Sequence, residues 1–292
     1  MLSACRPDNS NYTPEQVQAL NQYLDSRPPL PSKLLTAEIA KGASAVFVPD
    51  NVLRADSIRM IQAVLPAFYQ AGIRNMGVFF LSGIDQNRID SLILEPASPE
   101  SSARDSADQL LLSSGAAMGY REYTNFLLYV KQFNQSLANQ EEALRIWPAD
   151  TLLQQMKESS ESSEPAETAE TAEPAEKKEP VFLWLRDSSQ LDTEMEELVS
   201  FSHFGPGKNG LRWGGLMEKT LEERDIRDRS FSFKPSEPPF SEWQDEQNEP
   251  LKTNIFIVTP YQRRAVTPLP DLEDKTRSAA KYQRYLKHTE RN

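Results

Sequence analysis

The sequence has few of the residues that form covalent cross-links or transition-metal sites, with one cysteine and two histidines among 292 residues. A single cysteine excludes a framework of internal disulfide bonds. The two histidines, His203 and His288, are too few for a metal site built from several imidazoles of one chain. No apolar run approaches the ~18 residues that a membrane span requires. The sequence therefore predicts no disulfide scaffold and no transmembrane helix.

Positive charge is in deficit, since 32 Lys and Arg stand against 43 Asp and Glu, and the formal net charge is −11. This balance argues against nucleic acid or an anionic membrane surface as a partner, because both would be repelled. Residues 158–180 contain eight Glu and two Lys, so that −6 of the net charge lies in this one stretch. The rest of the chain is only mildly acidic, and its charge says little about its partners.

The acidic stretch, residues 158–180, differs in composition from everything around it. Glu recurs at every third position from 158 to 179, between Ser, Ala, Thr and Pro. Such residues bury too little apolar surface to offset the entropy of ordering the chain. A period of three also does not match the 3.6 residues of a helical turn. We therefore expect a disordered acidic insertion between two parts of one domain.

Two apolar runs with a helical pattern between them predict a strand–helix–strand unit. Ala45–Val48 and Gly77–Leu81 are typical of buried strands, and the segment between them has apolar residues at a spacing of three and four. Asp56 is a candidate cap for this helix, Pro66 is expected to kink it, and Gly72 to end it. A strand–helix–strand unit predicts a largely parallel sheet.

The remaining pattern completes a single α/β domain with a central, largely parallel sheet flanked by helices. Further strands are expected at Val181–Leu185 and Asn254–Val258, and a loop at 202–215. Because the strands after the insertion are too few for a sheet of their own, they are expected to join the first. Helices are expected at 85–94, 104–112, 121–139, 150–156 and 191–199. The expected organisation is a polar tether (1–33), the domain in two parts (34–157 and 181–274) and a polar C-terminal helix within 275–292.

Cys5 closes the tetrapeptide Leu2-Ser3-Ala4-Cys5, which is similar to a bacterial lipobox. In a lipobox the cysteine carries the lipid, and the polar segment that follows here suits a tether. The charged and apolar regions of a signal peptide do not stand before it in this sequence. An incidental cysteine is the alternative, but we favour lipidation because the one cysteine of the chain stands at this position.

The order of segments resembles the ChaN-like, Tiki and erythromycin-esterase-like superfamily, which includes haem-uptake lipoproteins. The run "AVFVPDNVLRADSIRMIQAVLPAFYQAGIRNMGVFF" is similar to the opening strand, helix and second strand of that family. "MGYREYTNFLLYVKQFNQS" resembles its Tyr-x-Glu-Tyr helix, and "ALRIW" its arginine-bearing strand. "GLRWGGLMEKTL" and "NIFIVTPYQRRAVTPLPDL" resemble later parts. The similarity covers roughly residues 35–275, interrupted by the acidic insertion.

The resemblance implies an α/β sandwich with a site of His and Glu at the strand ends, often metal-dependent, and haem binding in ChaN itself. Most of these site positions are lost here. The Gly-Glu-x-His motif is replaced by Val48-Pro49-Asp50-Asn51, and Phe79 and Phe80 stand where the second strand carries Glu. The strand expected to end in glycine and histidine has Leu185–Ser189 instead. The matches that remain are His203 and Arg145.

Several side chains are candidates for a rebuilt site. Asp50, Asp187 and His203 offer two carboxylates and an imidazole, which a divalent metal accepts as ligands. His203 or Tyr120 is a candidate haem ligand, if exposed. Simpler explanations stay open: Asp50 and Asn51 are ordinary turn residues, His203 an ordinary loop residue, and Glu122 a solvated helical carboxylate.

We therefore expect a bacterial lipoprotein with a ChaN-like fold and a degenerate active site, binding a small ligand or protein partner without catalysis. Its expected place is extracytoplasmic and lipid-anchored, on the periplasmic side or the cell surface; a soluble cytoplasmic protein is the alternative. One alternative function is a divalent-metal-dependent hydrolase with a rebuilt carboxylate and histidine site. Another is a haem-binding protein of iron uptake. The main expectation involves no cofactor, whereas the two alternatives involve a divalent metal and haem.

Overall fold

The structure is a computed structural model that describes most of the first two thirds of the chain and shorter stretches beyond. The described residues are 13–26, 31–40, 44–49, 55–95, 99–114, 118–161, 179–186, 198–204, 216, 220, 221, 223, 224, 231–233, 255–258, 267 and 269.

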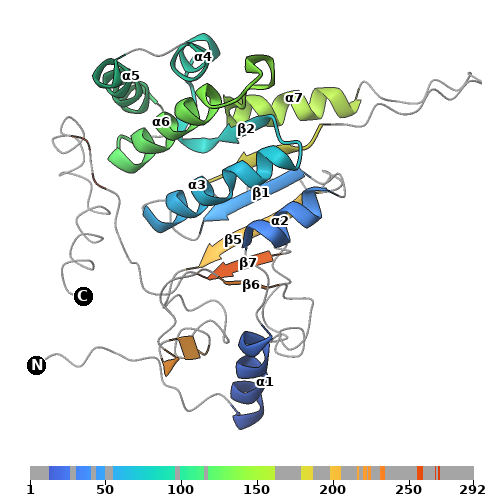
Figure 1. Cartoon of the computed structure of the whole chain (residues 1–292). Helices are drawn as coiled ribbons and strands as arrows, with labels where there is room; N and C mark the ends of the chain where they lie inside the picture. Colours follow the sequence, from blue (N-terminus) through green and yellow to red (C-terminus); the bar gives the residue numbers. More distant parts are fainter. Residues whose placement is uncertain are drawn as a thin grey trace, which may run out of the picture.

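In the described part of the chain, seven strands form one sheet in the order β3-β2-β4-β1-β5-β7-β6. Neighbouring strands are parallel throughout, except that β6 runs antiparallel to β7. The α/β class and the largely parallel sheet are thus confirmed (Figure 1). The strands are β1 (Ser44–Pro49), β2 (Asn75–Val78), β3 (Arg145–Pro148), β4 (Val181–Trp184), β5 (Leu198–Phe204), β6 (Phe231–Phe233) and β7 (Ile255–Val258).

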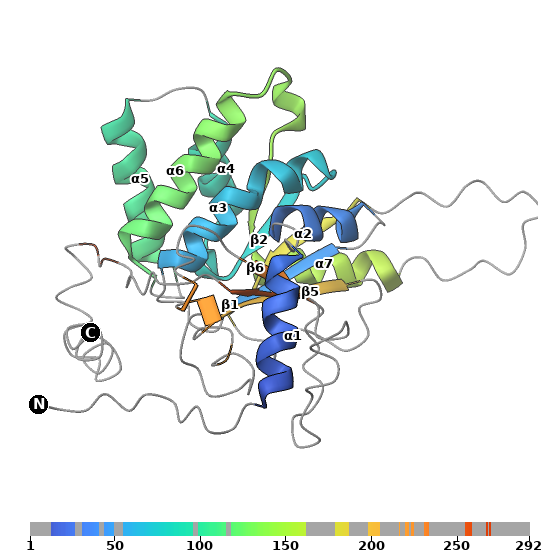
Figure 2. The same cartoon turned by 60° about the horizontal axis from the view of Figure 1, so that its bottom comes forward.

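Most of the described helices form a layer on one side of the strands (Figure 2). This layer comprises α2 and α3 together with α4, α5 and α6, whereas Figure 1 shows α1 apart from it. The helices are α1 (Pro14–Asp25), α2 (Pro31–Ile39), α3 (Ala55–Gln70), α4 (Gln86–Leu94), α5 (Glu100–Ser113), α6 (Arg121–Gln135) and α7 (Ala149–Glu161), with short 3-10 turns η2 (Phe79–Leu81) and η3 (Gln140–Glu142).

Alternation along the central strands divides the core between the two faces of the sheet. Phe47 of β1 and Trp184 of β4 belong to the large core under the helical layer. Val46 and Leu183, each one residue earlier, belong to a second core on the opposite face, which α7 covers with residues such as Leu152. Successive strand residues point to opposite faces, so a strand covered on both faces needs a continuous apolar run. This explains the runs that predicted β1 and β4.

The β1–α3–β2 unit forms as the sequence predicts. α3 is one continuous helix that includes Pro66, and its apolar side chains face the large core. Gly72 follows its end at φ = 101°, and its N–H donates to the carbonyl of Tyr69 at 3.1 Å. A left-handed residue after a helix favours glycine, because no side chain is strained there. Asp56 lies in the first turn of α3, since the helix begins at Ala55.

Two predictions about the second half of the chain are wrong. Leu198 and Val199, expected at the end of a helix, belong to β5, and so do residues 202–204, expected in a loop. β5 pairs with β1 over six residues in parallel register. This pairing provides backbone hydrogen bonds that the local sequence does not reveal. The second predicted strand is also shorter than expected, because β2 ends at Val78 and residues 79–81 form η2.

The N-terminal stretch expected to be a polar tether includes α1, and α2 begins at Pro31. Thr13 caps α1 with its hydroxyl in a capping box with Gln16. Leu20 and Leu24 of α1 are buried. The acidic insertion lies outside the described residues from 162 to 178, although α7 continues to Glu161 at its beginning. Cys5 and the expected C-terminal helix also lie outside.

Candidate functional site

Three neighbouring strands, β4, β1 and β5, end at the same edge of the sheet. Pro49, the last residue of β1, lies opposite His203 of β5 in the parallel register. On the other side of β1, Phe47 lies opposite Trp184, and the next residue, Leu185, donates its N–H to the carbonyl of Phe47 at 2.9 Å. In Figure 1 the arrows of β1 and β5 point to this edge. In open α/β sheets, ligands bind outside the carboxyl ends of the strands.

The chain therefore brings the three segments that carry the candidate metal ligands to one edge. Asp50 follows Pro49 directly in the sequence, and Asp187 follows Arg186, the last described residue after β4. Asp50, Asn51 and Asp187 themselves lie outside the described residues, and His203 is described by its backbone alone. The convergence of their side chains stays a prediction.

Arg145 lies at the opposite edge of the sheet, where the parallel strands begin. It is the first residue of β3, where it pairs with Asn75, the first residue of β2, and its N–H donates to the carbonyl of Arg74 at 2.8 Å. Because β3 is parallel to β1, its first residue belongs to the edge where the strands begin. Its side chain is exposed there. Arg145 therefore does not share an edge with the ends of β4, β1 and β5.

The end of β2 is filled by aromatic rings. Phe79 and Phe80, at the positions where the resemblance places a glutamate, are 4% and 0% exposed. The ring centroid of Phe80 lies 4.5 Å from that of Tyr123 and 5.4 Å from that of Trp184. Phe126 meets Trp184 edge to face with centroids 5.4 Å apart. Such arrangements are the favourable ones for aromatic pairs. We call Phe79, Phe80, Tyr123, Phe126 and Trp184 the aromatic cluster.

Two polar groups lie inside the aromatic cluster. The indole Nε1 of Trp184 is buried and has no hydrogen-bond acceptor among the described residues. Burial raises the pKa of Tyr123 well above its usual value, and the nearby Tyr120 and Glu122 raise it further, whereas Arg186 opposes the shift. The phenol of Tyr123 is therefore neutral near pH 7, and the cluster contains no carboxylate that could bind a metal.

Tyr120, the residue before α6, is buried with 5% of its surface exposed. Its ring centroid lies 6.4 Å from that of Tyr123, beside the aromatic cluster. Haem ligation at this position requires an exposed phenol, and the structure places the ring in the large core instead.

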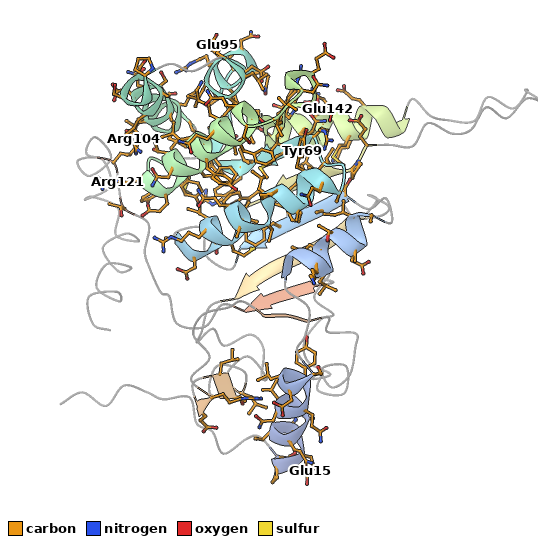
Figure 3. The ribbon with its side chains drawn as sticks, viewed as in Figure 1. Glu15, Tyr69, Glu95, Arg104, Arg121 and Glu142 are labelled. Atoms are coloured by element: carbon orange, nitrogen blue, oxygen red, sulfur yellow. The ribbon has the colours of Figure 1, made fainter. Side chains whose placement is uncertain are left out.

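Glu122 has a defined partner that the sequence does not indicate. Its Oε2 accepts a hydrogen bond from the N–H of Thr267 at 2.6 Å, and its Oε1 accepts one from the Thr267 hydroxyl at 3.0 Å. The two residues lie 145 positions apart, so no local pattern could have revealed the contact. Figure 3 labels the neighbouring Arg121 at the start of α6, on the side toward which the strands point.

The described residues contain no group of three or more His, Cys, Asp or Glu side chains placed to hold a metal ion. None of the described helices combines the length and the apolar character needed to cross a membrane.

The fold and the strand edge define an α/β protein with a largely parallel sheet. Neither a protein-family model nor a curated protein matches the chain. Among solved structures, the type III effector HopBA1 is similar at 11% sequence identity and a TM-score of 0.43, covering 80% of this chain and 96% of that one.

Proposed function

We propose that this chain is a bacterial lipoprotein with a ChaN-like fold and a degenerate active site, which binds a small ligand or a protein partner without catalysing a reaction. The observation that supports the proposal is the aromatic filling at the end of β2. Phe79 and Phe80 occupy the position of a family glutamate, and both are buried against other rings. The lipid is carried by Cys5, on the extracytoplasmic side of a membrane.

The aromatic cluster supports loss of catalysis for a chemical reason. A metal-dependent hydrolase needs about three protein ligands and an open coordination position for water. Phenyl and indole rings supply no such ligand, and a carboxylate introduced among rings whose centroids lie 4.5 to 6.2 Å apart would lose its hydration. In this proposal the scaffold is kept while packing groups stand in place of its reactive groups, so that the protein keeps a binding surface and loses a reaction.

Metal content and hydrolysis measured together test this proposal. The full chain is incubated with Zn²⁺, Mn²⁺ or Mg²⁺ and desalted, and its metal content is measured by inductively coupled plasma mass spectrometry. The same samples are assayed on p-nitrophenyl esters and on a peptide library. We expect no stoichiometric metal and no hydrolysis above the blank. Stoichiometric metal, together with hydrolysis that Asp50→Ala abolishes, would overturn the proposal.

Binding and anchoring need positive measurements of their own. A thermal-shift screen of small metabolites is expected to find a ligand that raises the melting temperature, and Asn51→Ala at the strand edge is expected to reduce the shift. Mass spectrometry of the protein isolated from its native membranes is expected to find a diacylglyceryl thioether on Cys5. An unmodified Cys5 in that material would contradict the lipoprotein part of the proposal.

A second candidate function is a divalent-metal-dependent hydrolase with a rebuilt site of Asp50, Asp187 and His203. The observation that favours it is the register of the strands, in which Pro49 lies opposite His203 and β4 lies on the other side of β1. Neighbouring strands are about 4.8 Å apart, so residues at their ends come within reach of one metal ion. The metal analysis above decides between the two, since this candidate expects His203→Ala to lose the bound metal.

A further inference from the structure

The start of α6 holds a distant segment of the same chain by backbone hydrogen bonds. The N–H of Arg121 donates to the carbonyl of Thr267 at 2.8 Å, and the N–H of Leu269 donates to the carbonyl of Gly119 at 2.9 Å. The two bonds lie on either side of Tyr120, whose backbone is extended and forms a single bridge. Backbone pairing of this kind is how proteins bind an extended peptide by adding a strand.

The side chain of Glu122 adds a requirement for a hydroxyl group. Its two carboxylate oxygens accept from the two donors of Thr267, the backbone N–H at 2.6 Å and the hydroxyl at 3.0 Å. Hydrogen bonds to an ionised carboxylate are stronger than those between neutral groups. Together with Arg121, Glu122 thus engages the amide, the carbonyl and the hydroxyl of one threonine.

The third element is an apolar contact two residues further along the bound segment. The side chain of Leu269 is 4% exposed, whereas Thr267 is exposed. Residues two positions apart in an extended segment lie on the same face of it, so a hydroxyl residue and a leucine at this spacing form a short recognisable pattern. Main-chain bonds supply affinity in such sites, and buried side chains supply specificity.

We propose that residues 119–122 are a recognition site for an extended peptide segment of a partner protein, and that residues 267 and 269 of this chain occupy the site as an internal competitor. The peptide has Ser or Thr followed two positions later by Leu. The inference goes beyond the proposed function, because the site uses none of Asp50, Asp187 and His203 and does not depend on whether the chain catalyses a reaction.

The tether explains why the site is closed in the isolated chain. A segment attached to the same molecule has an effective concentration in the millimolar range, so a free peptide competes poorly with it. The hydrogen bonds of Glu122 to Thr267 are nevertheless exposed to solvent, and such contacts open and close readily. Weakening the internal segment should therefore open the site, and changing Leu269 also removes one buried leucine side chain.

The experiment measures binding of a fluorescein-labelled peptide with the sequence of residues 263–272 to the full chain by fluorescence anisotropy. In the opened variant, Thr267→Val combined with Leu269→Ser, we expect the peptide to bind at least tenfold more tightly than to the unmodified chain. Adding Glu122→Gln to the opened variant should weaken binding at least tenfold. Glu141→Gln, which changes an exposed glutamate elsewhere, is the matched control and should have no effect.

Two results would overturn the proposal. One is a folded opened variant that binds no more tightly than the unmodified chain; the other is an affinity that Glu122→Gln leaves unchanged. If the opened variant does not fold, amide hydrogen exchange of the unmodified chain tests the proposal instead. Excess peptide should then accelerate exchange of the Leu269 amide, and a Thr→Val peptide should not. An unchanged exchange rate would also refute the proposal, whatever metal or hydrolysis measurements show.

Discussion

Pro49 of β1 lies opposite His203 of β5, at the edge where three neighbouring strands end. Their pairing joins segments more than 150 residues apart and defines the place where a ligand would meet the sheet. The three segments with the candidate site residues Asp50, Asp187 and His203 meet here, although a helix and a loop were expected where β5 forms.

Cysteine pairs test the register at this edge. In a Cys5→Ser background, Pro49→Cys with His203→Cys should form a disulfide on mild oxidation, because a Cα separation of about 5 Å suits the bond. Pro49→Cys with Phe201→Cys is the matched control, since its offset of two residues places the Cα atoms about 8 Å apart. Mass spectrometry after digestion measures the linked fraction. Equal linking in both pairs would contradict the register.

Phe80 should not tolerate the carboxylate that the family resemblance places near it. Phe80→Ala is expected to lower the free energy of unfolding by about 3–5 kcal/mol, because it leaves a cavity among packed rings. Phe80→Glu should cost more than Phe80→Leu, since the carboxylate also loses its hydration. Urea denaturation measures both. Phe133→Glu, at a partly buried position, is the control and should cost less than Phe80→Glu. Comparable costs would mean that the cluster is not sealed from water.

Tyr123 should make the fold sensitive to alkaline pH. Because burial raises its pKa in the folded state, the unfolded chain ionises first, from about pH 10 upward. The folded state then binds more protons than the unfolded state, so stability falls as pH rises. Tyr123→Phe should remove up to about 1.4 kcal/mol per pH unit of this slope. Tyr129 is less buried, so Tyr129→Phe should remove a smaller part of this slope. Denaturation between pH 9 and 11 measures the slope for both variants. Identical slopes would exclude the effect.

Gly77 is needed where α7 crosses β2. A Cβ at this position would lie 2.9 Å from Cδ2 of Leu183 and 3.2 Å from the Cα of Ala149. Gly77→Ala is therefore expected to cost about 1–3 kcal/mol of stability from overpacking. Adding Leu183→Val should recover part of the loss, and the coupling appears in a double-mutant cycle by urea denaturation. Strictly additive effects would show that the contact is not the cause.

Much of the fold could be predicted because its signals are local. β1, α3 and β4 are recognisable from apolar runs and helical periodicity, and Gly72 ends α3 as expected. β5 was missed because its stability comes from pairing with β1 rather than from a pattern of its own. β6 is the outermost strand next to β7, with which it pairs antiparallel. It has only three residues, which leaves almost no periodic signal in the sequence.

The candidate site was harder to predict because its parts are joined by tertiary contacts. The resemblance predicts which positions have lost His or Glu, and the aromatic cluster shows what packs around Phe79 and Phe80. Arg145 was chosen for its strand, but only the strand direction shows that it lies at the opposite edge. The contact of Glu122 with Thr267 depends on how the C-terminal segment returns to α6, which no sequence period encodes.

The position of β1 in the middle of the sheet determines when the protein can fold during its synthesis. Ala45 pairs with Phe182 on one side and with Val199 on the other. A ribosome must therefore add well over a hundred residues, including the acidic stretch, before β1 meets either neighbour. Until then β1 has exposed apolar side chains and unpaired backbone groups, which chaperones or other nascent chains can bind. Nascent chains arrested before residue 181 should be cut readily by protease within β1, and those released at full length should resist.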